Sequence, residues 1–210
     1  MSFFNTTATL RHTSQLPAGT DKTTAVKAML QDHRAFIQCG PHSVDCATVA
    51  DDEAAQLAET ALASHAKSEH PLPEDVRAVL ESSPREKDGR RFGVYRVTDV
   101  VQTLPAGLWD SKVVSTYEMT DMPSGVFVRI RSPMSIVMDT TWTVAETEGG
   151  GDASDSASET KLVLVEEIVI YCSRLLVGTV KGLCEGGWQQ IHGNMMKRLA
   201  EGDAAEMGKQ

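Results

Sequence analysis

Hydrophobic side chains follow two different periods along the chain. In residues 21–38 and 174–200 they recur every three or four positions, the spacing that places them on one face of a helix. In residues 3–12 and between residues 92 and 172 they alternate with polar side chains or stand among β-branched ones, as is typical of strands. The pattern predicts a strand and a helix near the start of the chain, a series of strands, and a long last helix.

Short connections that contain Pro, Ser or Gly separate most of the later strands, so successive strands are predicted to pair as antiparallel neighbours. The predicted strands are residues 92–101, 112–120, 125–131, 135–145 and 161–172. Residues 146–160 are rich in Gly, Ser, Asp and Glu and lack large apolar side chains, so we expect a flexible loop there.

Residues 43–91 have the weakest pattern. A short strand over 43–49 and two short helices over 51–66 and 74–80 are predicted, but their apolar content is too small for a separate core. We therefore predict one domain over residues 1–200, in which residues 43–91 form a helical insertion or a lid. The polar residues 201–210 are predicted to be a disordered tail.

This order of elements predicts an α+β fold, in which a curved antiparallel β-sheet of about seven strands is wrapped around the long C-terminal helix. The space between such a sheet and its helix is a natural ligand cavity. The helix contains several glycines, and each costs about 0.5–1 kcal/mol relative to alanine in a helix interior, so we expect a packing or cavity reason for them. These glycines are Gly178, Gly182, Gly186, Gly187 and Gly193.

Charge and composition exclude several classes of function. The 210 residues carry a net charge of −9, which disfavours binding to nucleic acid or to an anionic membrane surface. No apolar run has the roughly 20 residues that span a bilayer, so we expect no membrane insertion. The first residues have neither the basic nor the apolar region of a signal peptide, which favours a cytoplasmic location. No pattern indicates an oligomeric state.

Motifs for metals and cofactors are also missing from the sequence. The four cysteines, Cys39, Cys46, Cys172 and Cys184, include no CxxC pair and are interpreted as reduced structural thiols. There is no glycine-rich nucleotide loop, no HExxH and no GxSxG elbow. We expect neither a metal nor a cofactor.

Alternation along the strands and the helix period select the candidate site. The more apolar faces of the strands at 113–119 and 136–144 contain Tyr117, Met119, Met138 and Trp142, and the last helix places Trp188 and His192 on one side. Tyr, Trp and Met side chains would suit a flat apolar ligand. These six residues are the predicted ligand-binding set, and Arg129 and Asp139 are predicted to be solvated charges on the outer face. His33, on the apolar stripe of the first helix, is interpreted as a satisfied core histidine.

The strand at 162–171 leaves two alternatives open. Both of its faces are apolar, and each contains one glutamate, Glu166 or Glu167. A carboxyl group turned into an apolar cavity has a raised pKa and can serve as a general acid or base. The candidates for catalysis are therefore His192, Glu166 and Tyr117.

Several short sequences occupy defined positions in the predicted order of strands and helices. They are Arg11-His12 at the end of the first strand, Leu30-Gln31-Asp32-His33 before Pro41, residues 95–99, the strand pair 125–131 and 135–144, and the helix that contains Trp188. With them the chain resembles the helix-grip superfamily of START lipid-transfer domains, the major birch pollen allergen family and aromatic polyketide cyclases, and most closely its fungal members without an assigned activity. The resemblance implies a cavity for apolar or aromatic small molecules and transfers no catalytic residue.

Two functions remain open. The first is binding of a hydrophobic or aromatic small molecule, of lipid or secondary-metabolite type, between the sheet and the last helix. The second is an enzyme of cyclase or dehydratase type that acts on a polyketide-like substrate in the same cavity. The second function also requires an acid and a base that converge inside the cavity.

Overall fold

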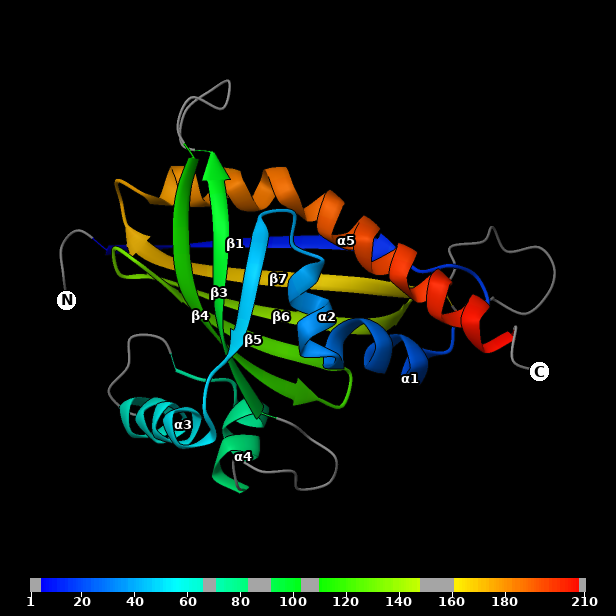
Figure 1. The fold of residues 1–210 in the computed structure, drawn as a ribbon, viewed down its shortest axis with the longest axis horizontal. Helices are drawn as coiled ribbons and strands as arrows, with labels where there is room; N and C mark the ends of the chain where they lie inside the picture. The colour runs from blue at the N-terminus through cyan, green and yellow to red at the C-terminus, as the bar shows by residue number, and fades with distance from the viewer. Residues whose placement is uncertain (1–4, 66–70, 83–91, 103–109, 148–160, 208–210) are drawn as a thin grey trace.

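The computed structural model of the chain describes residues 5–65, 71–82, 92–102, 110–147 and 161–207. Within these residues, seven strands form one antiparallel sheet in the order β1-β7-β6-β5-β4-β3-β2, so that the first strand pairs with the last (Figure 1). The strands are β1 (Asn5–Gln15), β2 (Ser43–Thr48), β3 (Phe92–Gln102), β4 (Asp110–Met122), β5 (Gly125–Ser132), β6 (Ile136–Thr147) and β7 (Lys161–Ser173).

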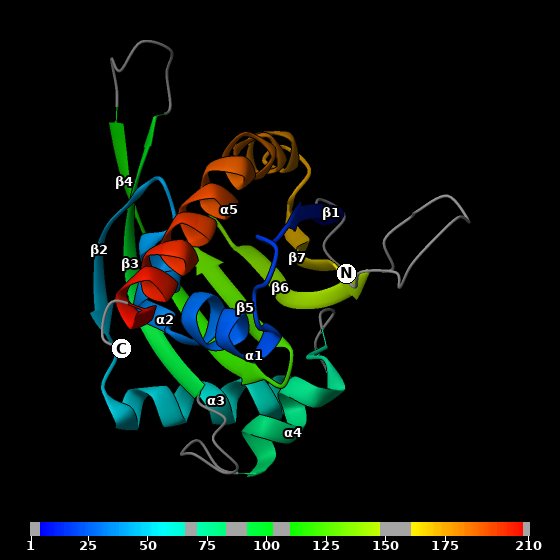
Figure 2. The ribbon, with the colours of Figure 1, turned by 90° about the vertical axis from the view of Figure 1, so that its right-hand side faces the viewer.

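Helices cover the concave face of this sheet. The long helix α5 (Val177–Met207) lies against β1 and β7, and α1 (Lys22–Ala25), η1 (Val26–Gln31) and α2 (His33–Gln38) lie beside it (Figures 1 and 2). The predicted α+β helix-grip fold is confirmed. Helix α5 continues past residue 200, so residues 201–207 are helical and not the disordered tail that we predict from composition.

The predicted helix over residues 21–38 is interrupted. η1 is a π-helix, and Asp32 after it leaves the helical conformation with φ −82° and ψ 85°. The Asp32 carboxylate accepts a hydrogen bond from the backbone N–H of Ala35 at 3.1 Å and so caps the start of α2. The break turns α2 toward β2, against which it packs.

The insertion packs on the outer face of the sheet. Helices α3 (Asp51–His65) and α4 (Glu74–Ser82) lie at the opposite end of the molecule from α5 in both ribbon views (Figures 1 and 2). They share a small apolar cluster with Met122 of β4 and Phe127 of β5. The insertion therefore completes its core with side chains of the sheet, which is why its own apolar content is low.

The main core lies between the concave face and the helices. Val126, Val128 and Ile130 of β5 face into it, as their alternation predicts. The open choice on β7 is settled by burial. Glu166 is 3% exposed on the concave side, whereas Glu167 is exposed and forms an ion pair with Arg11 of β1 at 3.2 Å.

Two expectations about polar and small residues are wrong. Arg129 and Asp139 form a cross-strand pair on the outer face, but they are only 4% and 7% exposed, and the Arg129 guanidinium lies 6.0 Å from the centroid of the Phe127 ring. The glycines of α5 at 178, 182, 186 and 193 have open space on their Cα side, with nothing within 4 Å of a Cβ. Among the five glycines, Gly187 alone meets a neighbour, since a Cβ there would lie 4.0 Å from Cγ of Pro41, so the expected packing reason is found at this position. The predicted flexible loop falls largely at residues 148–160, outside the described residues.

The buried pair generates a test of the fold. The Arg129 guanidinium donates to Asp139 through Nε at 2.7 Å and through Nη2 at 2.6 Å. We expect Asp139→Ala to lower the free energy of unfolding by about 3–5 kcal/mol, because the buried guanidinium loses its carboxylate. Replacement of both residues by apolar ones should recover most of that loss. The measurement is urea-induced unfolding.

Glu167→Ala is the matched control. It breaks a cross-strand pair on the same sheet that is exposed to water, and a loss below about 1 kcal/mol is expected. If Asp139→Ala were as mild as this control, the outer face would not be closed over the pair.

Candidate functional site

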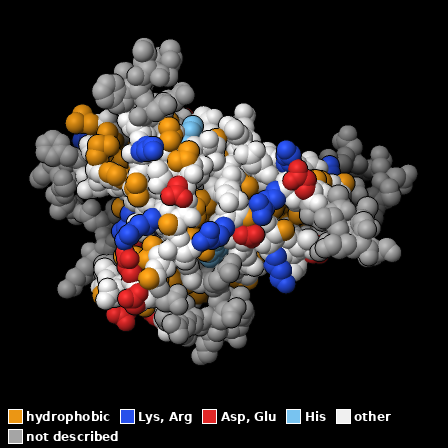
Figure 3. Space-filling view, viewed as in Figure 1, with side chains coloured by type: hydrophobic (Ala, Val, Ile, Leu, Met, Phe, Trp, Pro, Cys, Tyr) orange, Lys and Arg blue, Asp and Glu red, His pale blue; other side chains and the backbone are white. Residues whose placement is uncertain are grey.

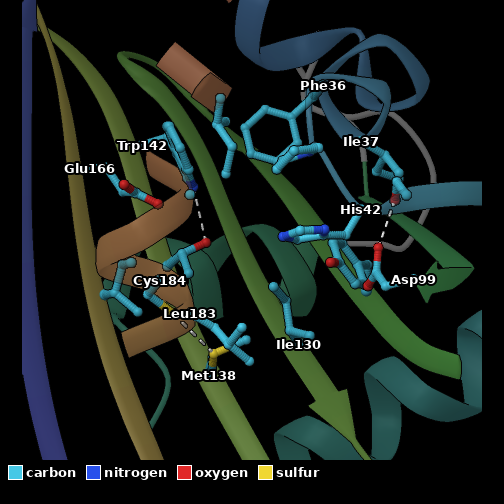
Figure 4. Close-up of a pocket in the computed structure, with 18 residues that line it drawn as sticks. Phe36, Ile37, His42, Asp99, Ile130, Met138, Trp142, Glu166, Leu183 and Cys184 are labelled. Carbon is cyan, nitrogen blue, oxygen red and sulfur yellow. Dashed lines mark hydrogen bonds between the residues drawn. The ribbon is translucent and has the colours of Figure 1, made fainter. Parts of the chain in front are cut away.

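A cavity of about 230 Å³ lies between the concave face of the sheet, α5 and the segment that joins α2 to β2 (Figure 4). Its walls come from β3 to β7, from α2 and from α5. The lining residues are Phe36, Ile37, Gly40, Pro41, His42, Ser43, Asp99, Tyr117, Ile130, Met138, Thr140, Trp142, Glu166, Ile168, Leu183, Cys184, Gly187 and Ile191.

Aromatic and aliphatic side chains form the middle of the cavity. Phe36 meets Trp142 edge to face, with ring centroids 5.2 Å apart. Ile130 and Met138 are direct cross-strand neighbours on β5 and β6, and the thiol of Cys184 on α5 approaches the Met138 sulfur at 4.0 Å. These contacts create an apolar chamber with one flexible thioether in its wall.

One end of the chamber is polar at Asp99. The Ser43 hydroxyl donates to Oδ1 of Asp99 at 3.0 Å, and the Tyr117 hydroxyl also hydrogen-bonds to this carboxylate. Burial raises the pKa of Asp99, and the hydrogen bonds from Ser43 and Tyr117 together with the nearby His42 offset part of that rise. Burial and the Asp99 charge raise the pKa of Tyr117, so its phenol keeps its proton.

Glu166 lies on the opposite side of the chamber from Asp99 (Figure 4). Nδ1 of His12 on β1 donates to Oε2 of Glu166 at 2.8 Å, and Nε2 of His192 on α5 lies 3.6 Å from the same oxygen. Nδ1 of His192 is 2.7 Å from the Ser14 hydroxyl. The Trp188 indole stacks on His12 with centroids 4.8 Å apart and an angle of 4°. We call Ser14, His12, Glu166, Trp188 and His192 the histidine cluster.

The mouth of the cavity lies between α5 and residues 40–43. Gly187 approaches Pro41 there, and Leu183, 43% exposed, stands at the same stretch of the helix. Hydrophobic side chains gather over the end of the molecule where α5 begins, while positive and negative side chains are interspersed over the remainder of that face (Figure 3). The mouth of the cavity is therefore partly apolar, and an apolar molecule can approach it.

The structure brings together only part of the residue set predicted from the sequence. Tyr117, Met138, Trp142 and Glu166 line the cavity. Met119 is fully buried in the main core, and Trp188 and His192 lie behind Glu166 rather than at the cavity surface. His33 is a satisfied core histidine, because Nε2 contacts Asp121 at 2.8 Å and Nδ1 contacts the Tyr95 hydroxyl at 3.2 Å.

Sequence reasoning missed Asp99 and Phe36 as cavity residues. A signal for Asp99 was present, because it has the same strand phase as Tyr95 and Val97, which are both in the main core. Phe36 belongs to the apolar stripe of the first predicted helix, and nothing local distinguishes a cavity wall from a packed core there. The described helices α3 and α4 contribute no lining residue, so this part of the insertion does not cover the cavity.

No group of three His, Cys, Asp or Glu side chains is arranged to hold a metal ion in the part of the chain that the structure describes. Among the same residues, no helix combines the length and the hydropathy required to cross a membrane.

A sheet that grips one long helix around an internal cavity defines a helix-grip domain. The chain belongs to the family described as "Domain of unknown function (DUF7053)", which it matches over residues 5–201. None of the curated proteins compared with the chain matches it.

Solved structures with a similar chain path include the crystal structure of Ara h 8.0201, which is 12% identical with a TM-score of 0.44, over 91% of this chain and 99% of that one. They also include an uncharacterized protein from Rhizobium leguminosarum, which is 12% identical with a TM-score of 0.42, over 94% of this chain and 97% of that one.

The cavity wall makes a prediction about Cys184. Burial, together with the Glu166 charge, raises the pKa of this thiol to about 11. In a variant with Cys39, Cys46 and Cys172 replaced by alanine, we expect the rate of alkylation to rise about tenfold per pH unit up to about pH 9.5, because only the thiolate reacts. The measurement is the rate of iodoacetamide labelling by mass spectrometry.

A short cysteine peptide is the control, and its rate should level off above its ordinary pKa of about 8.5. A Cys184 profile that levelled off together with the peptide would mean that water reaches this wall freely.

Proposed function

We propose that this protein binds one hydrophobic or aromatic small molecule, of lipid or secondary-metabolite type, in the cavity between the sheet and α5. The observation that carries the proposal is the chamber itself, whose volume of about 230 Å³ lies between apolar walls. An engineered apolar cavity of about 150 Å³ in another protein binds benzene, so this chamber has room for a larger ring system.

The lining supports an aromatic or flat ligand. Phe36 and Trp142 contribute aromatic rings that meet each other edge to face, and Met138 can adjust its side chain to different shapes. Of the ligand-binding residues expected from sequence, we assign direct contact to Tyr117, Met138 and Trp142. Trp188 and His192 act behind the wall, by holding Glu166 and α5 in place.

A second candidate is an acid–base enzyme of cyclase or dehydratase type that acts on a polyketide-like substrate. It is favoured by Glu166 and Tyr117, which both line the cavity, and by the His192 imidazole beside Glu166. Chemical conversion of a bound compound, lost in Glu166→Gln, would support this candidate over simple binding.

Filling the chamber tests the proposal. An environment-sensitive apolar dye should bind the wild type saturably, with a stoichiometry near one. Met138→Trp places an indole in the chamber, and we expect it to weaken dye binding by about tenfold or more with a change in stability of only about 1–3 kcal/mol. The measurement is fluorescence titration, paired with urea unfolding of each variant.

Leu175→Trp is the control, because Leu175 is 90% exposed and does not line the cavity. It should leave dye binding unchanged. Absence of saturable binding to the wild type, or equal effects of the two substitutions, would contradict a ligand in this chamber.

A further inference from the structure

Several hydrogen-bond donors in the chamber wall are already engaged with other atoms of the protein. The indole Nε1 of Trp142 donates to Oγ1 of Thr140 at 3.1 Å, and the Thr140 hydroxyl points to the Val128 carbonyl at 3.5 Å. The Cys184 thiol is directed at the Met138 sulfur. These groups therefore have no proton to offer a ligand without giving up an existing contact.

The same holds at the Asp99 end. The hydroxyl protons of Ser43 and Tyr117 are both directed at the Asp99 carboxylate. A hydroxyl that donates its only proton keeps lone pairs, so each of these oxygens can act only as an acceptor toward a third group. Carboxylate and both hydroxyls together present the chamber with a cluster of acceptors.

The charges of the lining residues also favour a ligand that donates a hydrogen bond. None of the described residues that line the chamber is Lys or Arg, and the two carboxylates face only one basic lining side chain, the exposed His42. Glu166 is already engaged by His12 and lies beside His192. Asp99 has no such imidazole contact within hydrogen-bonding distance among the described residues, and its partners are neutral hydroxyls. It is the more available acceptor of the two.

We infer that the ligand of this chamber is an apolar molecule that carries a hydrogen-bond donor, an ammonium or a hydroxyl group, directed at Asp99, and that carboxylate ligands such as fatty acids are rejected. This inference rests on the proposed function, since it names the class of molecule that the chamber selects. A carboxylate at this end would face a second carboxylate and acceptor oxygens, against which the exposed His42 imidazole is the one donor side chain among the described lining residues that is not engaged in the wall.

Four probes with one ring system test the inference. Methylnaphthalene is the apolar reference, naphthylmethanol adds a neutral donor, naphthylmethylamine adds a cationic donor, and naphthoate adds an anion. Isothermal titration calorimetry at about pH 7.5 compares the affinities of the four probes. We expect the alcohol or the amine to bind about tenfold more tightly than methylnaphthalene, and naphthoate to bind more weakly than it. The alcohol shows what a donor alone contributes, and any additional gain for the amine measures the contribution of charge.

Asp99→Asn locates the acceptor. It keeps the size of the side chain and one acceptor oxygen, removes the charge and adds an amide donor, so the advantage of the amine should disappear, that of the alcohol should shrink, and naphthoate should gain affinity. Asp45→Asn is the matched control, because Asp45 is exposed on β2 and does not line the chamber. It removes one negative charge nearby and should leave the order of the four probes unchanged.

The outcomes separate the inference from the function on which it rests. Wild-type binding of methylnaphthalene with naphthoate equal to or tighter than the alcohol and the amine overturns the inference and leaves the binding function standing. This comparison needs no variant, so it holds even if Asp99→Asn fails to fold. An unchanged probe order in folded Asp99→Asn overturns the assignment to Asp99. Failure of all four probes to bind the wild type contradicts the proposed function itself.

Discussion

The position of α5 depends on one buried carboxylate. Glu166 is 3% exposed, and a charge so far from water is tolerated only where protein groups replace its hydration. Its neighbours, His12 and His192, come from β1 and α5. Three segments that are distant in sequence are thereby required to meet at one point, and Trp188 covers His12 there by stacking.

The cavity follows from where that point lies. On the C-terminal side of His192, Met195 and Leu199 of α5 are buried in the main core, so this part of the helix is closely packed against its neighbours. On the N-terminal side of this point, α5 is held by Val180 and Cys184, which share an apolar cluster with Met138 of β6, while Ile130 lies on the next strand, β5. The space left between the concave face of the sheet and this part of α5 is the chamber, and the segment at residues 40–43 forms part of its wall. The chamber is therefore a consequence of how the helix is fixed.

Local pattern was sufficient for the strands, for the presence of the long last helix and for most of the inward faces. Alternation on β5 and the stripe of α5 predict the side chains that the structure places in the core, because a half-buried element must separate apolar from polar positions. The same rule failed on β7, where both faces are apolar, and pairing with β1 determined that Glu166 faces inward. It also failed at Arg129, because alternation assigns this side chain to the outer face and does not show that it is buried there.

The candidate site was less predictable than the fold. Tyr117, Met138 and Trp142 line the chamber because they lie on inward faces, but so does Met119, which is enclosed by core side chains instead. Periodicity predicts on which side of a strand a residue lies. It does not predict whether a helix passes close enough to bury that residue. The polarity of the chamber depends on hydrogen bonds between elements, such as the one from Ser43 to Asp99, that no local pattern contains.

The central claim is that an apolar molecule enters the space between the sheet and α5. Nuclear magnetic resonance of the protein with isotope-labelled Ile and Met methyl groups, in the presence of methylnaphthalene, tests it directly. Intermolecular nuclear Overhauser effects should reach Ile130, Met138 and Ile191, which surround the chamber on strands and helix, and should be absent from Met119 in the packed core. Contacts confined to the exposed Met134 would show that the molecule binds only at the surface and would contradict the account.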